Sequence, residues 1–293
     1  MAADLYTAHF GFRERPFSLS PDPDFMFLSK AHARAFSILE YGLMTHAPLT
    51  VLTGEVGMGK TMLLQALLRQ VDEDVTLGLI SNAQGDRGDL LRWVLNALNV
   101  PLPEETDYVS LFQHFQNFVV NEYAAGRHVV LIIDEAQNLG ADMLEELRML
   151  TNINSGKDEL LQIILAGQPE LREILSRTEL RQFAQRVTVT YHLDPFTRSD
   201  TAAYIRHRLQ WVGGTGNEIS PQAISHIHLE AEGIPRSINK LCDLALVYAA
   251  SAEARLVGKP VINELIRDGI ILKPAPPPFI LTNRIDTTGK AAE

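Results

Sequence analysis

The stretch Gly54-Glu55-Val56-Gly57-Met58-Gly59-Lys60-Thr61 decides the fold expected for this chain of 293 residues. It has the pattern G-x-x-x-x-G-K-T of a phosphate-binding loop. An apolar, β-branched run at residues 49–53 precedes it and suits a buried strand, and residues 62–68 after it are rich in helix formers. This strand–loop–helix context disfavours the alternative of a glycine turn beside a chance Lys-Thr pair.

Two residues of this loop carry its chemistry. Glycines let backbone N–H groups turn inward toward phosphate oxygens, and the helix that follows adds the positive end of its dipole. We expect the loop and the next residue, Met62, to bind a nucleotide. Lys60 is expected to reach the β- and γ-phosphates, and the hydroxyl of Thr61 is expected to bind Mg²⁺.

The composition is that of an ordinary soluble globular protein, with 46% hydrophobic and 21% charged residues. The formal net charge of −10 argues against a surface that binds nucleic acid over its whole extent, although a local basic patch is compatible with it. The single cysteine, Cys242, excludes an intrachain disulfide. The N-terminus has no basic segment followed by an apolar run, and no apolar run is long enough to span a membrane, so we expect a cytoplasmic protein.

Strands alternate with helices over the first two thirds of the chain. Apolar, β-branched runs predict five strands, at residues 49–53, 75–80, 127–135, 160–166 and 187–191. Helices are predicted before or between them, at residues 30–44, 62–68, 88–98, 109–123, 143–150 and 170–177. The alternation predicts an α/β fold with a doubly wound, parallel five-stranded sheet, which we assign to a nucleotide-binding domain at residues 1–195.

The pattern changes after residue 195, where the predicted strands stop. Helices are predicted at residues 199–211, 221–231, 235–254 and 260–268, with glycine-containing breaks between them. We expect a small all-helical lid domain at residues 196–270. Residues 271–293 begin with a proline-rich run and are expected to form a disordered tail.

The N-terminal residues 5–28 are rich in aromatic residues and proline, a composition poorly suited to a helix or to a central strand. Two interpretations are equally compatible with it. Either the segment packs over a core, or the part around Phe17 forms a wall of an adenine pocket.

Asp134 and Glu135 follow the most strand-like run of the chain. The carboxyl end of a parallel strand is where such sheets bind ligands. We expect Asp134 to hold Mg²⁺ directly or through water, and Glu135 to orient and deprotonate an attacking water. A glutamate in this place favours hydrolysis over simple binding, and two solvated acids at a strand end are the less favoured alternative.

Further polar residues are candidates for the same site. Gln168, just past the fourth predicted strand, is expected to hydrogen-bond the γ-phosphate or the attacking water. Arg236 follows Gly233-Ile234-Pro235 at the start of a lid helix and is a candidate to bring a cation to the phosphates, with a solvated arginine as its alternative. Asn82, at the tip of the second strand, is a candidate to hold Glu135 in an inactive pose.

Residues 181–186 read Arg-Gln-Phe-Ala-Gln-Arg and come just before the fifth predicted strand. An arginine supplied to the nucleotide of a neighbouring subunit would stabilise the charge of the transition state. Arg186 is the first candidate for this role and Arg181 is the second, and the sequence leaves both open.

As a set, these motifs resemble AAA+ ATPases. The resemblance lies in residues 54–61, 131–137, 165–171 and 233–236. More narrowly, the chain is similar to the general secretion pathway protein A family, at residues 10–17, 20–25 and 39–43. Within that family it resembles most the branch associated with exosortase and exopolysaccharide-export systems, at residues 78–82, 90–95 and 181–186.

The resemblance implies an ATPase that uses ATP and Mg²⁺. It implies the Walker A motif at Gly54–Thr61, the Walker B motif at Asp134 and Glu135, sensor 1 at Gln168 and sensor 2 at Arg236. It also implies a nucleotide-dependent homo-oligomer, either a ring or a filament. Gln168 departs from the asparagine or threonine common at sensor 1. The chain also ends soon after the lid, without the membrane span and peptidoglycan-binding part of the secretion members, which argues against direct engagement of the cell wall.

Three functions fit these observations. The first is an oligomeric ATPase that assembles or regulates an envelope secretion or exopolysaccharide-export system, with any contact at the inner membrane made through a partner. The alternative is a DNA-associated regulator of the transposition or origin-binding type, although the acidic total favours an ordinary solvated lid face. The basic residues available for DNA on the lid are Arg198, Arg206, His207 and Arg208. The third is a nucleotide-gated scaffold with negligible turnover, which Glu135 argues against.

Overall fold

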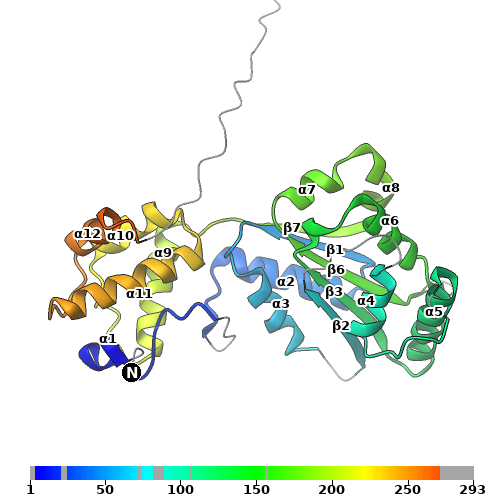
Figure 1. The fold of residues 1–293 in the computed structure, drawn as a ribbon, viewed down its shortest axis with the longest axis horizontal. Helices are drawn as coiled ribbons and strands as arrows, with labels where there is room; N and C mark the ends of the chain where they lie inside the picture. The colour runs from blue at the N-terminus through cyan, green and yellow to red at the C-terminus, as the bar shows by residue number, and fades with distance from the viewer. Residues whose placement is uncertain are drawn as a thin grey trace, which may run out of the picture.

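The computed structural model describes residues 4–20, 25–71, 74–81, 89–105, 107–155 and 158–270. Two bodies make up this part of the chain: an α/β body built on one parallel sheet, and a helical body beside it (Figure 1). Asn82, Gly88 and the predicted tail at residues 271–293 lie outside the described residues. Within the described residues, every helix is too short or too polar to cross a bilayer.

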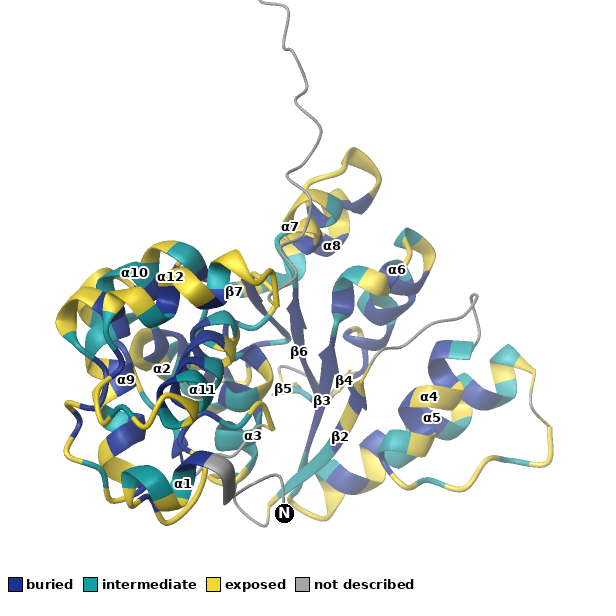
Figure 2. Ribbon diagram, turned by 60° about the vertical axis from the view of Figure 1, so that its left-hand side comes forward, coloured by how far each residue is buried: buried dark blue, intermediate teal, exposed yellow. Residues whose placement is uncertain are grey.

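The sheet has five parallel strands in the order β2-β3-β6-β1-β7, which confirms the predicted α/β fold. The strands are β1 (Leu49–Gly54), β2 (Val75–Ser81), β3 (His128–Asp134), β6 (Leu161–Gly167) and β7 (Val187–Leu193). The three central strands are buried along nearly their whole length, which explains why their sequences are apolar on both faces (Figure 2). All five predicted strands are present, and their carboxyl ends meet at one edge of the sheet.

Helices cover both faces of the sheet. One face packs against α2 (Lys30–Met44) and α3 (Lys60–Leu68). The other face packs against α4 (Asp89–Ala97), α5 (Tyr108–Ala124), α6 (Ala141–Leu150), α7 (Glu170–Leu175) and α8 (Arg181–Arg186). Short connecting elements are η2 (Ala136–Asn138), η3 (Thr178–Leu180) and an antiparallel hairpin of β4 (Asn154–Ser155) and β5 (Asp158–Glu159). Sequence periodicity did not predict these short elements, because they are too short to show a pattern.

The lid has its own hydrophobic core. Its helices are α9 (Arg198–Trp211), α10 (Pro221–Ala231), α11 (Pro235–Ser251) and α12 (Lys259–Arg267), close to the predicted ranges. Thr197 and Asp200 form a capping box that fixes the start of α9, and Pro235 occupies the first turn of α11. Cys242 is fully buried in this core, as its position in the apolar face of α11 indicates.

The N-terminal segment differs from the prediction in two ways. Residues 4–10 form a helix, α1 (Asp4–Phe10), where the sequence was expected to be a poor helix former. The first proline of the chain is Pro16, so nothing in α1 itself breaks a helix. The aromatic residues Tyr6, Phe12 and Phe17 are buried in the lid core, so this part of the segment packs with the lid, whereas Met26 near its end packs against the α/β body.

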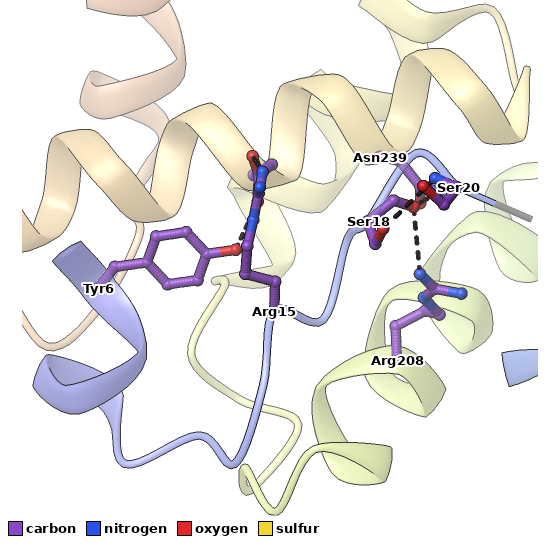
Figure 3. Close-up of polar contacts among 7 residues, drawn as sticks. Tyr6, Arg15, Ser18, Ser20, Arg208 and Asn239 are labelled. Atoms are coloured by element: carbon purple, nitrogen blue, oxygen red, sulfur yellow. Dashed lines mark hydrogen bonds and ion pairs between the residues drawn. The ribbon is translucent and has the colours of Figure 1, made fainter. Parts of the chain in front are cut away.

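Residues 11–20, which we call the strap, run along the lid and are fastened to it at several points, two of which involve charged side chains of α9 and α11 (Figure 3). At one point, Tyr6 and Arg15 both donate hydrogen bonds to Asp243 of α11. At the other, the Nε of Arg208 donates to the carbonyl of Pro16 at 2.6 Å, and the guanidinium lies 4.3 Å from the ring centre of Phe25.

Arg208 is 3% exposed, so it is not part of a basic lid surface as the sequence analysis assumed. The strap carbonyls and the ring of Phe25 draw this guanidinium inward. Arg198 donates to Ser225, and Arg206 is exposed. The basic surface considered for DNA therefore loses one of its four residues to the interior.

The Arg208→Leu variant is expected to unfold at a lower urea concentration than the wild type, because its free energy of unfolding should fall by about 2–4 kcal/mol. The reason is that the strap carbonyls lose their buried donors. The matched control is Arg206→Leu, an exposed arginine of the same helix, whose loss should stay within about 0.5 kcal/mol. Equal shifts of the two urea midpoints would contradict the fastening role of Arg208.

Candidate active site

A cavity of about 290 Å³ lies at the carboxyl edge of the sheet, where the α/β body meets the strap and the lid. The α/β body contributes Glu135 and residues 56–63, which cover most of the phosphate loop and the first turn of α3. The segment that follows the strap contributes Phe25, Met26 and Phe27, and the lid contributes Arg208, Arg236 and Asn239 among others. The lining combines apolar side chains on one side with backbone N–H groups and charges on the other, as a nucleotide requires.

The phosphate loop has the backbone geometry that its glycines predict. Gly57 and Gly59 have φ angles of +85° and +91°, and Gly59 is the residue from which α3 begins. The Nζ of Lys60 lies inside the loop, where it donates to the carbonyls of Gly54 at 2.7 Å and Glu55 at 3.1 Å. Burial lowers the pKa of Lys60, and the carboxylates of Glu135 and Asp134 counteract part of that shift.

Thr61 and Asp134 are brought together from the start of α3 and the end of β3. The hydroxyl of Thr61 donates to Oδ2 of Asp134 at 2.7 Å. Two hard oxygen ligands at this distance fit Mg²⁺, which takes one or two protein ligands and completes its shell with water and phosphate oxygens. The described residues contain no group of three or more His, Cys, Asp or Glu side chains that could hold a metal ion.

Two glutamine side chains hold Glu135. The Nε2 of Gln137 donates to Oε2 of Glu135 at 2.6 Å, and the Nε2 of Gln168 donates to the same oxygen at 3.2 Å. Partial burial raises the pKa of Glu135, but these two hydrogen bonds and the charge of Lys60 outweigh it, so the net shift is downward. The carboxylate is therefore ionised at neutral pH, which is the form that a general base needs.

Arg236 brings the lid to the phosphate loop. Its backbone N–H donates to the carbonyl of Gly57 at 3.2 Å, and a Cβ on Gly57 would stand 2.6 Å from the Cβ of Arg236. In the part of the chain that the structure describes, the exposed guanidinium of Arg236 has no hydrogen-bond or ion-pair partner. It lines the cavity, so it is free to meet an anion there.

His32 is a site residue that the sequence analysis missed. Its Nε2 contacts the carbonyl of Met58 in the phosphate loop at 2.9 Å, and its Nδ1 contacts the hydroxyl of Ser29 at 2.8 Å. Burial lowers its pKa, so the ring is neutral and Nε2–H donates to Met58. The signal in the sequence was the spacing Ser29-x-x-His32 at a helix start, which by itself indicates only a cap.

Seven predicted residues do not line the cavity. Four of them contact or adjoin residues that do line it, namely Gly54, Glu55, Asp134 and Gln168. The other three lie elsewhere. Phe17 is buried in the lid core, and the apolar wall is formed by residues a few positions later in the chain. Arg186 contacts Glu159 at 3.4 Å and also Asn152, and Arg181 is exposed with no partner among the described residues. Both arginines lie on or beside α8, away from the cavity of their own chain.

Comparison with known proteins agrees with this geometry. The family model described as AAA domain matches residues 43–175. General secretion pathway protein A of Aeromonas hydrophila is 40% identical over 245 residues, which cover 84% of this chain and 45% of that protein. The chain thus spans less than half the length of this relative.

Two solved structures have the same fold. Cdc6p from Pyrobaculum aerophilum superposes with a TM-score of 0.66 at 14% identity, covering 85% of this chain and 70% of that one. The ORC1 protein of Aeropyrum pernix, in complex with DNA, gives 0.61 at 17% identity, covering 87% and 69%. Residues 43–175 of this chain are therefore similar to AAA domains, most of the chain is similar to General secretion pathway protein A, and the solved structures share its fold.

Proposed function

We propose that this chain hydrolyses ATP in the presence of Mg²⁺ and couples the cycle to the assembly or regulation of an envelope secretion or exopolysaccharide-export system. The observation that carries the hydrolytic part is the meeting of Lys60, Thr61, Asp134 and Glu135 at one edge of the sheet. A binding module needs the first three of these groups. Glu135 is the additional group that hydrolysis needs, because water must lose a proton as it attacks.

Each residue has a role that its position supports. The N–H groups of the phosphate loop bind the phosphate oxygens, and Lys60 turns from the loop carbonyls to the β- and γ-phosphates. Thr61 and Asp134 would hold Mg²⁺, which neutralises phosphate charge when it is bound. Gln168 holds Glu135, and Arg236 adds a cation from the lid.

The lid offers a means to turn hydrolysis into movement. Arg236 lines the cavity, its guanidinium has no partner among the residues that the structure describes, and its backbone already contacts Gly57 of the phosphate loop. Loss of the γ-phosphate removes an anion that this guanidinium binds. We infer that the lid and the strap that is fastened to it then shift together against the α/β body.

A second arginine is expected from a neighbouring subunit. Neither Arg181 nor Arg186 lines the cavity of its own chain, so either acts on nucleotide only in a homo-oligomer. Arg181 is exposed and without a partner among the described residues, whereas Arg186 is held by Glu159 and Asn152. We propose that one of the two is an arginine finger, and paired variants decide which.

Mixing two inactive proteins is expected to restore hydrolysis if the finger acts between subunits. Arg181→Ala or Arg186→Ala keeps its own ATP site, and Glu135→Gln keeps its own finger. A mixture of the true finger variant with Glu135→Gln should regain at least about a tenth of the wild-type rate per site, because arginine fingers contribute about 10³–10⁵-fold. The steady-state ATPase rate of the wild type should also rise more than linearly with protein concentration.

The DNA-associated alternative is tested in the same assay. Stimulation by duplex DNA that fades steeply as salt rises would show phosphate contacts and move that alternative to first place. We expect no such stimulation, because Arg208 is buried and the whole chain carries a net charge of −10.

A further inference from the structure

We propose that Gln137 is a positioning residue that orients the carboxylate of Glu135 toward the attacking water, an inference that rests on the proposed hydrolysis of ATP. Gln137 lies in η2, one turn past the end of β3. Its side-chain amide joins two strands of the sheet at their carboxyl ends. The Nε2 donates to Oε2 of Glu135 at 2.6 Å, and the Oε1 accepts from the backbone N–H of Gln168 at 2.9 Å.

Glu135, Gln137 and Gln168 form a closed triangle of hydrogen bonds, one of them from the backbone N–H of Gln168. Gln168 donates from its own Nε2 to the same oxygen of Glu135, at 3.2 Å. Oε2 of Glu135 therefore receives two hydrogen bonds, whereas Oε1 has no partner among the described residues. Because Glu135 lines the cavity, Oε1, which has no partner in the described part of the chain, is the oxygen assigned to accept a proton from water.

The backbone explains why this carboxylate needs support. Glu135 has a φ of +55°, a left-handed conformation that a glutamate rarely adopts. Its backbone N–H donates to Oδ1 of Asp134 at 2.9 Å, so the turn is tied to the residue assigned to Mg²⁺. The two amides limit the rotamers open to the side chain of Glu135, which keeps the base close to its working geometry.

Gly167 leaves space for the side-chain amide of Gln137 in its observed position. A Cβ on Gly167, at the end of β6, would stand 3.0 Å from Oε1 of Gln137 and 2.9 Å from a methyl carbon of Leu171. A larger residue there would push the amide away from the Gln168 backbone. The absence of a side chain at Gly167 thus lets the amide of Gln137 bridge Gln168 and Glu135.

Two substitutions separate the donor from the acceptor of this amide. Gln137→Leu removes both, and Gln137→Glu keeps an oxygen for the N–H of Gln168 but removes the donor to Glu135. Both are expected to lower kcat by about 10- to 100-fold, part of the 10²–10⁴-fold that a positioned base contributes. The KM for ATP and the Kd for ADP should change by less than about twofold, since the side-chain amide of Gln137 does not contact the phosphate loop. Gln113→Leu, the same change on the exposed face of α5, is the matched control and should be neutral.

The deciding measurement repeats Gln137→Leu in the Glu135→Gln background. Because Gln137 acts through Glu135, the second change should lower the residual kcat by no more than about twofold. An undiminished kcat in Gln137→Glu, or a full extra loss in the double variant, would overturn the role of Gln137 while leaving ATP hydrolysis established. Absence of ATP hydrolysis by the wild type would instead overturn the proposed function itself.

Discussion

Glu135→Gln is expected to lower kcat for ATP hydrolysis by about 100- to 10,000-fold while ATP still binds. The amide has nearly the shape of the carboxylate, but it does not accept a proton from water. It still has an oxygen for the hydrogen bonds that Gln137 and Gln168 donate, so the packing at the carboxyl edge of β3 should be kept. Single-turnover hydrolysis and the Kd for ATP, measured on the same preparation, separate the chemical step from binding.

The control for this variant is Glu173→Gln, which makes the same chemical change on an exposed position of α7. It should hydrolyse ATP at the wild-type rate. If Glu135→Gln hydrolysed ATP within about twofold of the wild type, Glu135 would not be the base. Negligible turnover by the wild type itself would instead make the nucleotide-gated scaffold the better description. A variant that lost ATP binding as well would show that Glu135 acts on the fold of the loop and not on water.

Sequence periodicity predicted the α/β body well because its central strands are buried on both faces. Residues 129–133 are apolar without interruption, and only a strand between two neighbours buries such a run. The glycines of the phosphate loop predicted its left-handed turns for a similar reason, since few other residues adopt those φ angles. In both cases a local pattern has one main physical explanation.

The N-terminal segment shows where such reasoning ends. Its aromatic residues predicted burial, and Phe12 and Phe17 are indeed buried, but no local pattern states which body buries them. Their place in the lid depends on Asp243 and Arg208, more than 190 positions away in the chain. Single-chain patterns carry no information on contacts at that separation, so the strap was assigned to residues 1–195.

The support of Glu135 was missed for the same kind of reason. Gln137 is an ordinary polar residue after a strand, and its role arises only because β6 lies beside β3 and places Gln168 within reach. His32 likewise gained its contact with Met58 through the packing of α2 beside the phosphate loop. Site residues that act through a neighbouring strand or helix become visible only when that neighbour is placed.

Lys60→Ala is expected to lower kcat/KM for ATP by at least about 100-fold. The reason is the loss of a cation whose attraction to the phosphate oxygens is stronger in the transition state than in the ground state. Lys60 is 5% exposed, and its Nζ is held by the carbonyls of Gly54 and Glu55, which are the groups it leaves when phosphate arrives. The cost of burying the ammonium is seen in its lowered pKa. A desolvated cation interacts with phosphate more strongly than one in water, so alanine here removes more binding than at any exposed lysine.

Stability and activity should separate in this variant. The ammonium is already desolvated in the free protein. Its removal should therefore change the free energy of unfolding, measured in urea, by about 1 kcal/mol or less. Lys240→Ala, an exposed lysine of the lid, controls for the loss of one positive charge and should keep the wild-type rate. If Lys60→Ala turned over ATP as fast as the wild type, the loop would not be the catalytic phosphate site, and the assignments of Thr61 and Asp134 would fail with it. If it folded normally but lost both ATP binding and hydrolysis, the cavity between loop and lid would be the single site at which nucleotide acts.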